Sequence, residues 1–221
     1  MTGVQTWALP ISIIETGTPG RAETHLRSTG FSVTRDSIRE LMTVATTVVG
    51  PDDWVCVSGS LPDGASMDDF IDICRLLKER AAGLAIDASG AALVAAVRLK
   101  PDIASPNAEE LLSLQLAPGI DESLAALAEA GIRIPVCTLG PSGAVCWVGG
   151  RRITAPSPAV NIASAVGAGD AFLAGFVVSV ANGADVSVAL RFAVRCGASA
   201  ATFPTAGRID ANFVRAAEPV V

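Results

Sequence analysis

Short apolar segments that alternate with helical patterns are the feature of this sequence that most restricts its fold. Each apolar segment ends in a loop of small or turn-forming residues, and apolar residues at helical spacing usually follow. The four segments comprise residues 54–57, 84–86, 102–104 and 134–138. Short apolar strands joined by helices indicate an α/β fold with a mainly parallel sheet and helices on both faces. Such sheets bind ligands beyond the carboxyl ends of their strands.

Several of the predicted helices have recognisable starts and stops. Ser66 is a suitable N-cap, Asp68 and Asp69 stand in the first turn, and Gly83 ends that helix. Further helices are predicted over residues 108–114, 122–130, 168–180, 186–202 and 210–217, and a hairpin over residues 144–148 and 152–154. A chain of 221 residues is long enough for one large domain, or for one domain with a small appendage.

The charge and the cysteine and histidine content argue against several classes of function. The net charge is -6 and the pI is about 4.8, which argues against nucleic acid as a main partner. The five cysteines include no pair at CxxC spacing, and His25 is the only histidine, so neither a disulfide framework nor a zinc site is expected. We therefore expect reduced thiols and a cytoplasmic protein. The most apolar stretch, residues 171–181, is too short to span a membrane.

The segment Gly167-Ala168-Gly169-Asp170 carries the most informative chemistry, because it leads directly into an apolar helical run. Small residues let a phosphate group approach the backbone closely, and a helix start offers it free N–H groups and the positive end of the helix dipole. An Asp in the first turn is placed to accept a proton from a hydroxyl that attacks the phosphate. The alternative is an ordinary helix start, in which the glycines form the turn and Asp170 interacts with the dipole.

This segment, followed by Ala174-Gly175-Phe176, resembles the second signature of the PfkB/ribokinase family of carbohydrate kinases. Four other segments resemble family landmarks and occur in the family's order: residues 58–64 (SGSLPDG), 87–90 (DASG), 106–110 (PNAEE) and 138–143 (TLGPSG). The resemblance extends from about Ile13 to the C-terminus. It implies a ribokinase-like, three-layer α/β/α fold with a mainly parallel central sheet, in which most of the lid sheet is missing.

The resemblance also implies a role for each matching position. Asp170 would be the catalytic base, and the backbone amides of residues 167–169 would form an anion hole. Asn107 and Glu110 would hold Mg²⁺ through its water ligands. The ATP-binding positions would be Thr138, Gly140, Gly143, Ala198 and Gly207.

The residues by themselves leave simpler interpretations open. Asn107 and Glu110 fit a helix capping box, in which each side chain bonds to the backbone N–H of the other residue. Residues 138–143 fit a turn at the end of a strand, and Ala198 fits ordinary packing between helices. Asp87 lies at the ligand-binding edge of the predicted sheet, where a strand-end cap is at least as suitable as a direct role.

Three departures from the family pattern are present. Ser105 replaces the lysine of a K-P-N motif, and Ala165 replaces a threonine that normally precedes the GAGD segment. The N-terminal sugar-binding motifs of the family have no counterpart in this sequence. We therefore expect a truncated kinase whose sheet has an unpaired apolar edge.

Three regions are predicted along the chain. Residues 1–12 resemble the translation of a sequencing-adapter read-through, and we interpret them as non-native. Residues 13–33 resemble a remnant of the lid and its return strand, in which Arg27 would contact a sugar phosphate or would simply be a solvated strand residue. Residues 34–221 would form the nucleotide-binding and catalytic α/β domain.

The predicted function is ATP-dependent phosphorylation of a hydroxyl of a sugar phosphate, with Mg²⁺ as the metal cofactor. Residues 58–64 and 87–90 favour fructose 1-phosphate, fructose 6-phosphate or tagatose 6-phosphate as the acceptor. The alternatives are an inactive nucleotide-binding fragment and a kinase of another sugar or nucleoside in the same family. A homodimer is expected for the full-length protein, and neither nucleic acid nor a membrane is expected as a partner.

Overall fold

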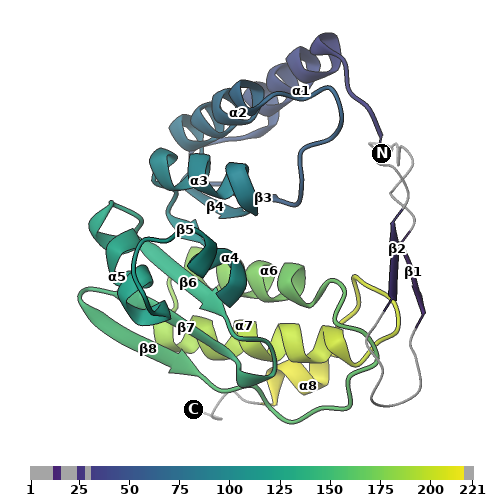
Figure 1. Ribbon diagram of the computed structural model, residues 1–221, viewed down its shortest axis with the longest axis vertical. Coiled ribbons are helices and arrows are strands. Elements are labelled where there is room, and N and C mark those ends of the chain that lie inside the picture. Colours follow the sequence, from purple (N-terminus) through teal and green to yellow (C-terminus); the bar gives the residue numbers. More distant parts are fainter. Residues whose placement is uncertain (1–11, 16–23, 28–30, 217–221) are drawn as a thin grey trace.

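A six-stranded sheet forms the centre of the computed structural model, which describes residues 12–15, 24–27 and 31–216 (Figure 1). The strands are ordered β3-β4-β5-β6-β7-β8. Their bounds are Trp54–Ser58 (β3), Gly83–Asp87 (β4), Ile103–Ala104 (β5), Ile134–Thr138 (β6), Ala144–Val148 (β7) and Arg151–Ala155 (β8). β3 to β6 pair in parallel, and β7 and β8 continue the sheet as an antiparallel hairpin. The predicted mainly parallel sheet is confirmed.

Helices cover both faces of the sheet, as predicted. One face is covered by α6 (Ala168–Ala181) and α7 (Val186–Ala201), and α8 (Ala211–Arg215) packs against α7. The other face carries α1 (Arg35–Val48), α2 (Met67–Arg80), α3 (Gly90–Leu99), α4 (Ala108–Ser113) and α5 (Ile120–Glu129). A single 3₁₀ turn, η1 (Gly140–Ser142), links β6 to β7.

The side chains of the central strands alternate between the two layers of helices. In β4, Ala85 belongs to the core formed with α6 and α7, whereas Leu84 and Ile86 belong to the core formed with α2 and α3. In β5, Ile103 and Ala104 divide in the same way. Successive side chains of a strand point to opposite faces, so a strand buried on both faces is apolar at every position. This explains why the strands are continuous apolar runs in the sequence.

Two glycines allow α6 and α7 to pack closely. A Cβ atom at Gly175 would lie 2.7 Å from Sγ of Cys196. A Cβ atom at Gly197 would lie 3.0 Å from the carbonyl oxygen of Ala168, which is in the first turn of α6. These positions exclude larger side chains without a shift of the backbone. The contact at Gly197 holds the start of α6, and with it the GAGD segment, against the C-terminal part of α7.

Helices α1 and α3 are not predicted by the sequence patterns. The second half of α1 is rich in Thr and Val, which have low helix propensity, although Thr34 caps the helix by accepting a hydrogen bond from the Ser37 N–H (3.2 Å). Helix α3 begins at Gly90 without a side-chain cap and is almost entirely apolar. A short helix without a polar face lacks the periodicity that indicates a helix in a sequence.

The N-terminal region contributes a separate pair of strands. β1 (Ser12–Glu15) and β2 (Thr24–Arg27) are antiparallel, with Ser12 opposite Arg27. The side chain of Arg27 and residues 1–11 lie outside the described part of the chain, so the predicted sugar-phosphate contact and the non-native segment stay predictions. None of the described helices is long and apolar enough to cross a membrane.

Candidate active site

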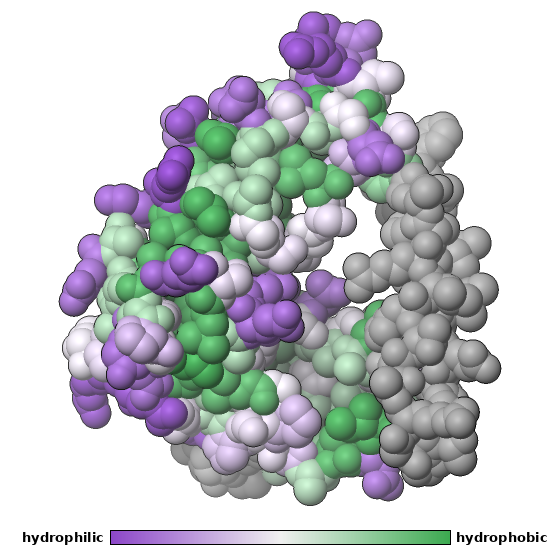
Figure 2. Space-filling view, viewed as in Figure 1, coloured by the Kyte–Doolittle hydropathy of each residue, from purple (hydrophilic) through white to green (hydrophobic). Residues whose placement is uncertain are grey.

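The ends of three parallel strands and the starts of two helices meet around a cavity of about 150 Å³. β4 ends at Asp87, β5 is followed by Ser105, and β6 ends at Thr138. The cavity is lined by Asp87, Ser105, Asn107, Glu110, Thr138 and Gly169. It lies at the carboxyl end of the parallel strands, where α/β sheets bind ligands. Figure 2 shows the molecule hollowed between the part that contains α1 to α3 and the part that contains α6 and α7, with hydrophilic residues on the wall of the hollow.

The GAGD segment forms the start of α6 as predicted. Gly167 is the N-cap residue and has φ 79° and ψ 1°, a left-handed conformation that favours glycine. A Cβ atom at this position would also lie 2.9 Å from Cβ of Ala206. At Gly169, by contrast, an added Cβ atom would meet nothing within 4 Å, because this residue faces the open cavity.

One of the three predicted anion-hole amides is already used inside the protein. The N–H of Ala168 donates to the carbonyl oxygen of Ala165 (3.2 Å). The N–H groups of Gly167, Gly169 and Asp170 have no acceptor among the described residues. Free N–H groups at the first turn of a helix, together with the helix dipole, suit the binding of an anion. Asp170 is exposed and stands at the same helix start.

The capping box that the sequence left open as an alternative is present at α4. Oδ1 of Asn107 accepts a hydrogen bond from the Glu110 N–H, and Oε2 of Glu110 accepts one from the Asn107 N–H, both at 2.9 Å. Both side chains nevertheless line the cavity. A capping role and a ligand-binding role are compatible here, because a carboxylate has two oxygens and several lone pairs.

Asp87 is a site residue to which the sequence assigned no definite role. It is partly buried at the end of β4, and burial raises its pKa to about 6, with further contributions from Glu110 and Asp170. Three carboxylates therefore interact electrostatically at this end of the sheet. Its position directly after an apolar strand, in the DASG segment, was the only signal for it in the sequence.

The predicted nucleotide loop lies beside the cavity and has a strict steric requirement. A Cβ atom at Gly143 (φ 97°) would lie 2.0 Å from the carbonyl oxygen of Ala155 and 2.7 Å from the backbone N of Ser157. Gly140 also has a positive φ, of 55°, but an added Cβ atom there would meet nothing within 4 Å. Gly143 therefore has a structural reason to be glycine, whereas Gly140 lies in open space beside the end of β6.

The remaining predicted ATP-binding positions lie near the start of α6. The backbone N of Gly207 would be 3.7 Å from a Cβ atom at Gly167, which places the loop after α7 against the GAGD segment. Ala198 is buried in α7, next to the Gly197 that contacts Ala168. Thr138 lines the cavity. Gly207 and Ala198 thus lie near the start of α6, and Thr138 lines the same cavity as Gly169.

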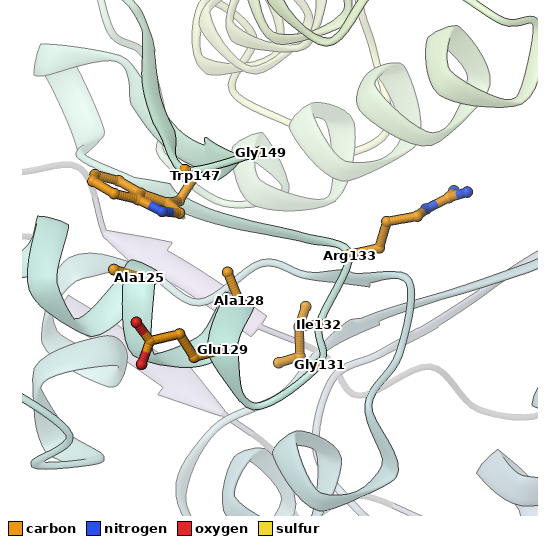
Figure 3. Close-up of a pocket in the computed structure, with 9 residues that line it drawn as sticks. Ala125, Ala128, Glu129, Gly131, Ile132, Arg133, Trp147 and Gly149 are labelled. Atoms are coloured by element: carbon orange, nitrogen blue, oxygen red, sulfur yellow. The ribbon is translucent and has the colours of Figure 1, made fainter.

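A larger cavity, of about 540 Å³, lies at the opposite end of the sheet. Its lining includes Ile132 and Arg133, which precede β6, and Trp147 and Gly149 of the β7–β8 hairpin. Figure 3 shows the side chain of Arg133 pointing away from Glu129 and Trp147. This cavity is wide and shallow and contains none of the predicted site residues.

The described residues contain no group of three or more His, Cys, Asp or Glu side chains placed to hold a metal ion by themselves. The oxygen donors around the smaller cavity do fit Mg²⁺, which keeps several of its water ligands and takes only one or two carboxylates from a protein. The predicted binding of Mg²⁺ through water is compatible with this geometry.

Comparisons with known proteins agree with the motifs. Residues 29–209 match the sequence family described as pfkB family carbohydrate kinase. A 1-phosphofructokinase from Rhodobacter capsulatus is 36% identical over 146 residues, which cover 64% of this chain and 46% of the relative. A 1-phosphofructokinase from Escherichia coli (strain K12) is 34% identical over 194 residues, which cover 85% of this chain and 62% of the relative.

The fold also matches a solved structure. A crystal structure of a phosphofructokinase-2 mutant from Escherichia coli superposes with a TM-score of 0.81 and 23% identity, covering 88% of this chain and 65% of that chain. The chain therefore spans about half of one curated relative (46%) and less than two thirds of the other (62%). On the match over residues 29–209 and the identity to the Escherichia coli relative, the chain belongs to the pfkB family of carbohydrate kinases.

Proposed function

We propose that this chain is the nucleotide-binding and catalytic part of an ATP-dependent kinase that phosphorylates a hydroxyl group of a sugar phosphate. The observation that carries the proposal is the start of α6, where free backbone N–H groups and the carboxylate of Asp170 adjoin a cavity at the carboxyl end of the sheet. Phosphoryl transfer requires an anion site, an in-line acceptor and a base, and these elements are compatible with that arrangement.

In the proposed reaction, the acceptor oxygen attacks the γ-phosphorus of ATP and the bond from this phosphorus to the ADP oxygen breaks. The proton of the hydroxyl group goes to the carboxylate of Asp170. The N–H groups of Gly167 and Gly169 stabilise the negative charge on the transferring phosphoryl group, because they point from a helix start and need not reorganise during the reaction. Asp170 is suited to the role of base because it is exposed beside this helix start.

The charges of the site supply a physical reason for a divalent cation. Glu110 and Asp170 lie close enough to Asp87 to contribute to its raised pKa, and a polyphosphate would add more negative charge. Mg²⁺ bound to the nucleotide would neutralise part of this charge and polarise the phosphate oxygens. Asn107 and Glu110 would hold its water ligands. Thr138, Gly140, Gly143, Ala198 and Gly207 would contact the nucleotide.

The acceptor is proposed from the relatives. Two 1-phosphofructokinases are 34% and 36% identical to this chain, which favours fructose 1-phosphate over fructose 6-phosphate or tagatose 6-phosphate. A second candidate function is nucleotide binding without turnover. It is favoured by the incomplete coverage of those relatives, because the acceptor site of a kinase can lie in the part that this chain does not span.

Two measurements on the purified chain separate these functions. Calorimetric titration with Mg·ATP tests the nucleotide site, and ADP formation with each of the three sugar phosphates tests phosphoryl transfer. Binding together with turnover that depends on fructose 1-phosphate supports the kinase. Binding without turnover for any acceptor, ribose and adenosine included, supports the nucleotide-binding function. Absence of Mg·ATP binding contradicts both.

A further inference from the structure

Ser105 has a fixed place between two strand ends. It directly follows β5, and its backbone N–H donates to the carbonyl oxygen of Ile86 in β4 (3.0 Å). The next residue, Pro106, has a rigid φ angle, and its carbonyl oxygen accepts a hydrogen bond from the N–H of Thr138 at the end of β6 (3.2 Å). The main chain around Ser105 is therefore tied to both neighbouring strands, and the place of the hydroxyl group varies mainly by rotation of the side chain.

The hydroxyl group of Ser105 has no hydrogen-bond partner among the described residues, although the residue is only 5% exposed. The other buried polar residues of the described part, Ser123, Ser164 and Ser199, all use their hydroxyl groups in hydrogen bonds to the backbone. No described side-chain oxygen is both sealed from solvent and without a partner, so Oγ of Ser105 opens into the smaller cavity, which this residue lines. A buried hydroxyl group of this kind indicates that a ligand supplies the partner.

The charge around Ser105 is negative and uncompensated. Asp87 and Glu110 line the same cavity, and none of the described residues that line it is a lysine or an arginine. The capping box uses Oε2 of Glu110, which leaves its other carboxylate oxygen available. A polyphosphate that enters this cavity would meet like charges, which oppose binding unless a cation accompanies the polyphosphate.

The residue type at position 105 determines how the site can respond to that charge. The K-P-N motif has a lysine at this position, and an ammonium group neutralises charge but donates hydrogen bonds only. A hydroxyl group is neutral, and it can donate one hydrogen bond and accept others. Mg²⁺ bound to a nucleotide keeps several water ligands. A serine can therefore contact both a metal-bound water and a phosphate oxygen, whereas it cannot replace the metal as a source of positive charge.

We propose that Ser105 makes nucleotide binding by this chain depend strongly on Mg²⁺, because its hydroxyl group binds the hydrated metal–nucleotide complex and brings no charge of its own. The hydroxyl group accepts a hydrogen bond from a water ligand of the metal and donates one to a phosphate oxygen. Metal-free ATP is disfavoured by the carboxylates of Asp87 and Glu110. Ser105 is thus a specificity-determining residue for the form of the nucleotide, an inference that rests on the proposed function because it places ATP in this cavity.

The test compares two forms of the nucleotide. The dissociation constants of Mg·ATP and of ATP in the presence of EDTA are measured by calorimetry, and their ratio is the readout. In the unaltered chain we expect metal-free ATP to bind at least about 100-fold more weakly than Mg·ATP. Ser105→Ala removes the hydroxyl group without adding charge, so the affinity for Mg·ATP should fall by about tenfold while the affinity for metal-free ATP hardly changes.

A second variant changes the charge at the same position. Ser105→Lys supplies an ammonium group beside the carboxylates, so metal-free ATP should bind more tightly and the ratio of the two dissociation constants should fall by at least about tenfold. The K-P-N motif of the family carries this lysine, so the fold accepts the side chain. If Ser105→Lys does not fold, the unaltered chain and Ser105→Ala decide the question.

Ser123→Ala is the matched control. It removes a fully buried hydroxyl group from α5, and Ser123 does not line the cavity. Both dissociation constants should stay within about twofold of those of the unaltered chain. Circular dichroism of each variant shows whether the chain remains folded.

Three results overturn the inference and leave the proposed function intact. The first is a similar affinity of the unaltered chain for metal-free ATP and for Mg·ATP. The second is an equal loss of affinity for both forms in Ser105→Ala, because the hydroxyl group would then only support the shape of the cavity. The third is an unchanged pair of dissociation constants in Ser105→Ala. Absence of Mg·ATP binding by the unaltered chain has a different meaning, since it contradicts the proposed function and the inference together.

Discussion

The two ends of the central sheet each have a cavity, and the smaller one is lined by the candidate site residues. At the carboxyl end, about 150 Å³ is enclosed by the strand-end residues Asp87 and Thr138, the capping pair Asn107 and Glu110, and the helix start at Gly169. At the opposite end, about 540 Å³ is lined by small and apolar residues of α5 and by the β7–β8 hairpin. The larger cavity has one carboxylate, Glu129, and no helix start facing it.

The difference follows from how a parallel sheet is connected. Every parallel strand delivers its following loop and helix start to the same end, so polar side chains and free N–H groups accumulate there. The other end receives the carboxyl ends of helices and the return connections. Volume alone is therefore a poor guide to where polar side chains and free N–H groups gather in this fold.

The largest effect is expected at Asp170. In a form of the enzyme that turns over, Asp170→Asn removes the proposed base while keeping the shape of the side chain, so kcat should fall by about 10²- to 10⁴-fold. The affinity for Mg·ATP, measured by calorimetry, should change by less than about twofold, because an amide in the first helical turn does not block the anion site. A near-normal kcat in this variant would remove Asp170 from its assigned role.

A second effect is expected in the pH dependence of stability. Burial raises the pKa of Asp87 to about 6, whereas an unperturbed Asp has a pKa of about 3.9. The folded state holds the proton more tightly, so the free energy of unfolding should decrease as the pH rises from about 4 to about 6, by on the order of 1–3 kcal/mol. Asp87→Asn carries no titrating group and should flatten this part of the profile. The free energies of unfolding of the two proteins are measured by urea denaturation at both pH values. An equal change in the two proteins would contradict the raised pKa of Asp87.

A smaller effect is expected at Gly169. An added methyl group would meet no protein atom within 4 Å, so Gly169→Ala should fold normally and even gain up to about 1 kcal/mol of stability from helix propensity. The same methyl group points into the cavity, so the affinity for Mg·ATP should fall by about tenfold, or 1.4 kcal/mol. Gly50→Ala is the matched control, with its nearest contact, Oδ2 of Asp53, at 3.6 Å. Equal ATP affinities in the two variants would show that the helix start does not bind the nucleotide.

The smallest effect is expected at the larger cavity. Glu129→Gln removes its carboxylate, and both Mg·ATP affinity and kcat should stay within about twofold of the original values, because this end of the sheet faces away from the site. The measurement is the same calorimetric and ADP-formation pair. A tenfold change would reveal energetic coupling between the two ends of the sheet.

Much of the fold could be predicted from local patterns, and the exceptions have physical causes. The four parallel strands follow continuous apolar runs, and α2 and the helices from α4 onward begin at starts that are recognisable in the sequence. Helix α1 lacks a strong signal because its second half is rich in β-branched residues, and α3 lacks one because it is buried and nearly all apolar. Both are stabilised mainly by packing against α2 and the sheet, which a local pattern does not contain.

The sequence predicted the individual motifs of the site but did not predict how they are arranged in space. The GAGD helix start and the Asn107–Glu110 pair were both identifiable from residue types and spacing. The steric requirement at Gly143 was not, because it depends on Ala155 and Ser157, which lie further along the chain.

Local stereochemistry was sufficient to predict the four parallel strands and the helix start at the GAGD segment. It also set the capping box at α4. These features depend on interactions within a few residues, which short sequence motifs encode. The convergence of Asp87, Glu110 and Gly169 on one cavity, and the raised pKa of Asp87, were decided by the folded chain. Burial and electrostatic interaction depend on distances in space, and the parallel sheet creates those distances by bringing separate strand ends to one side.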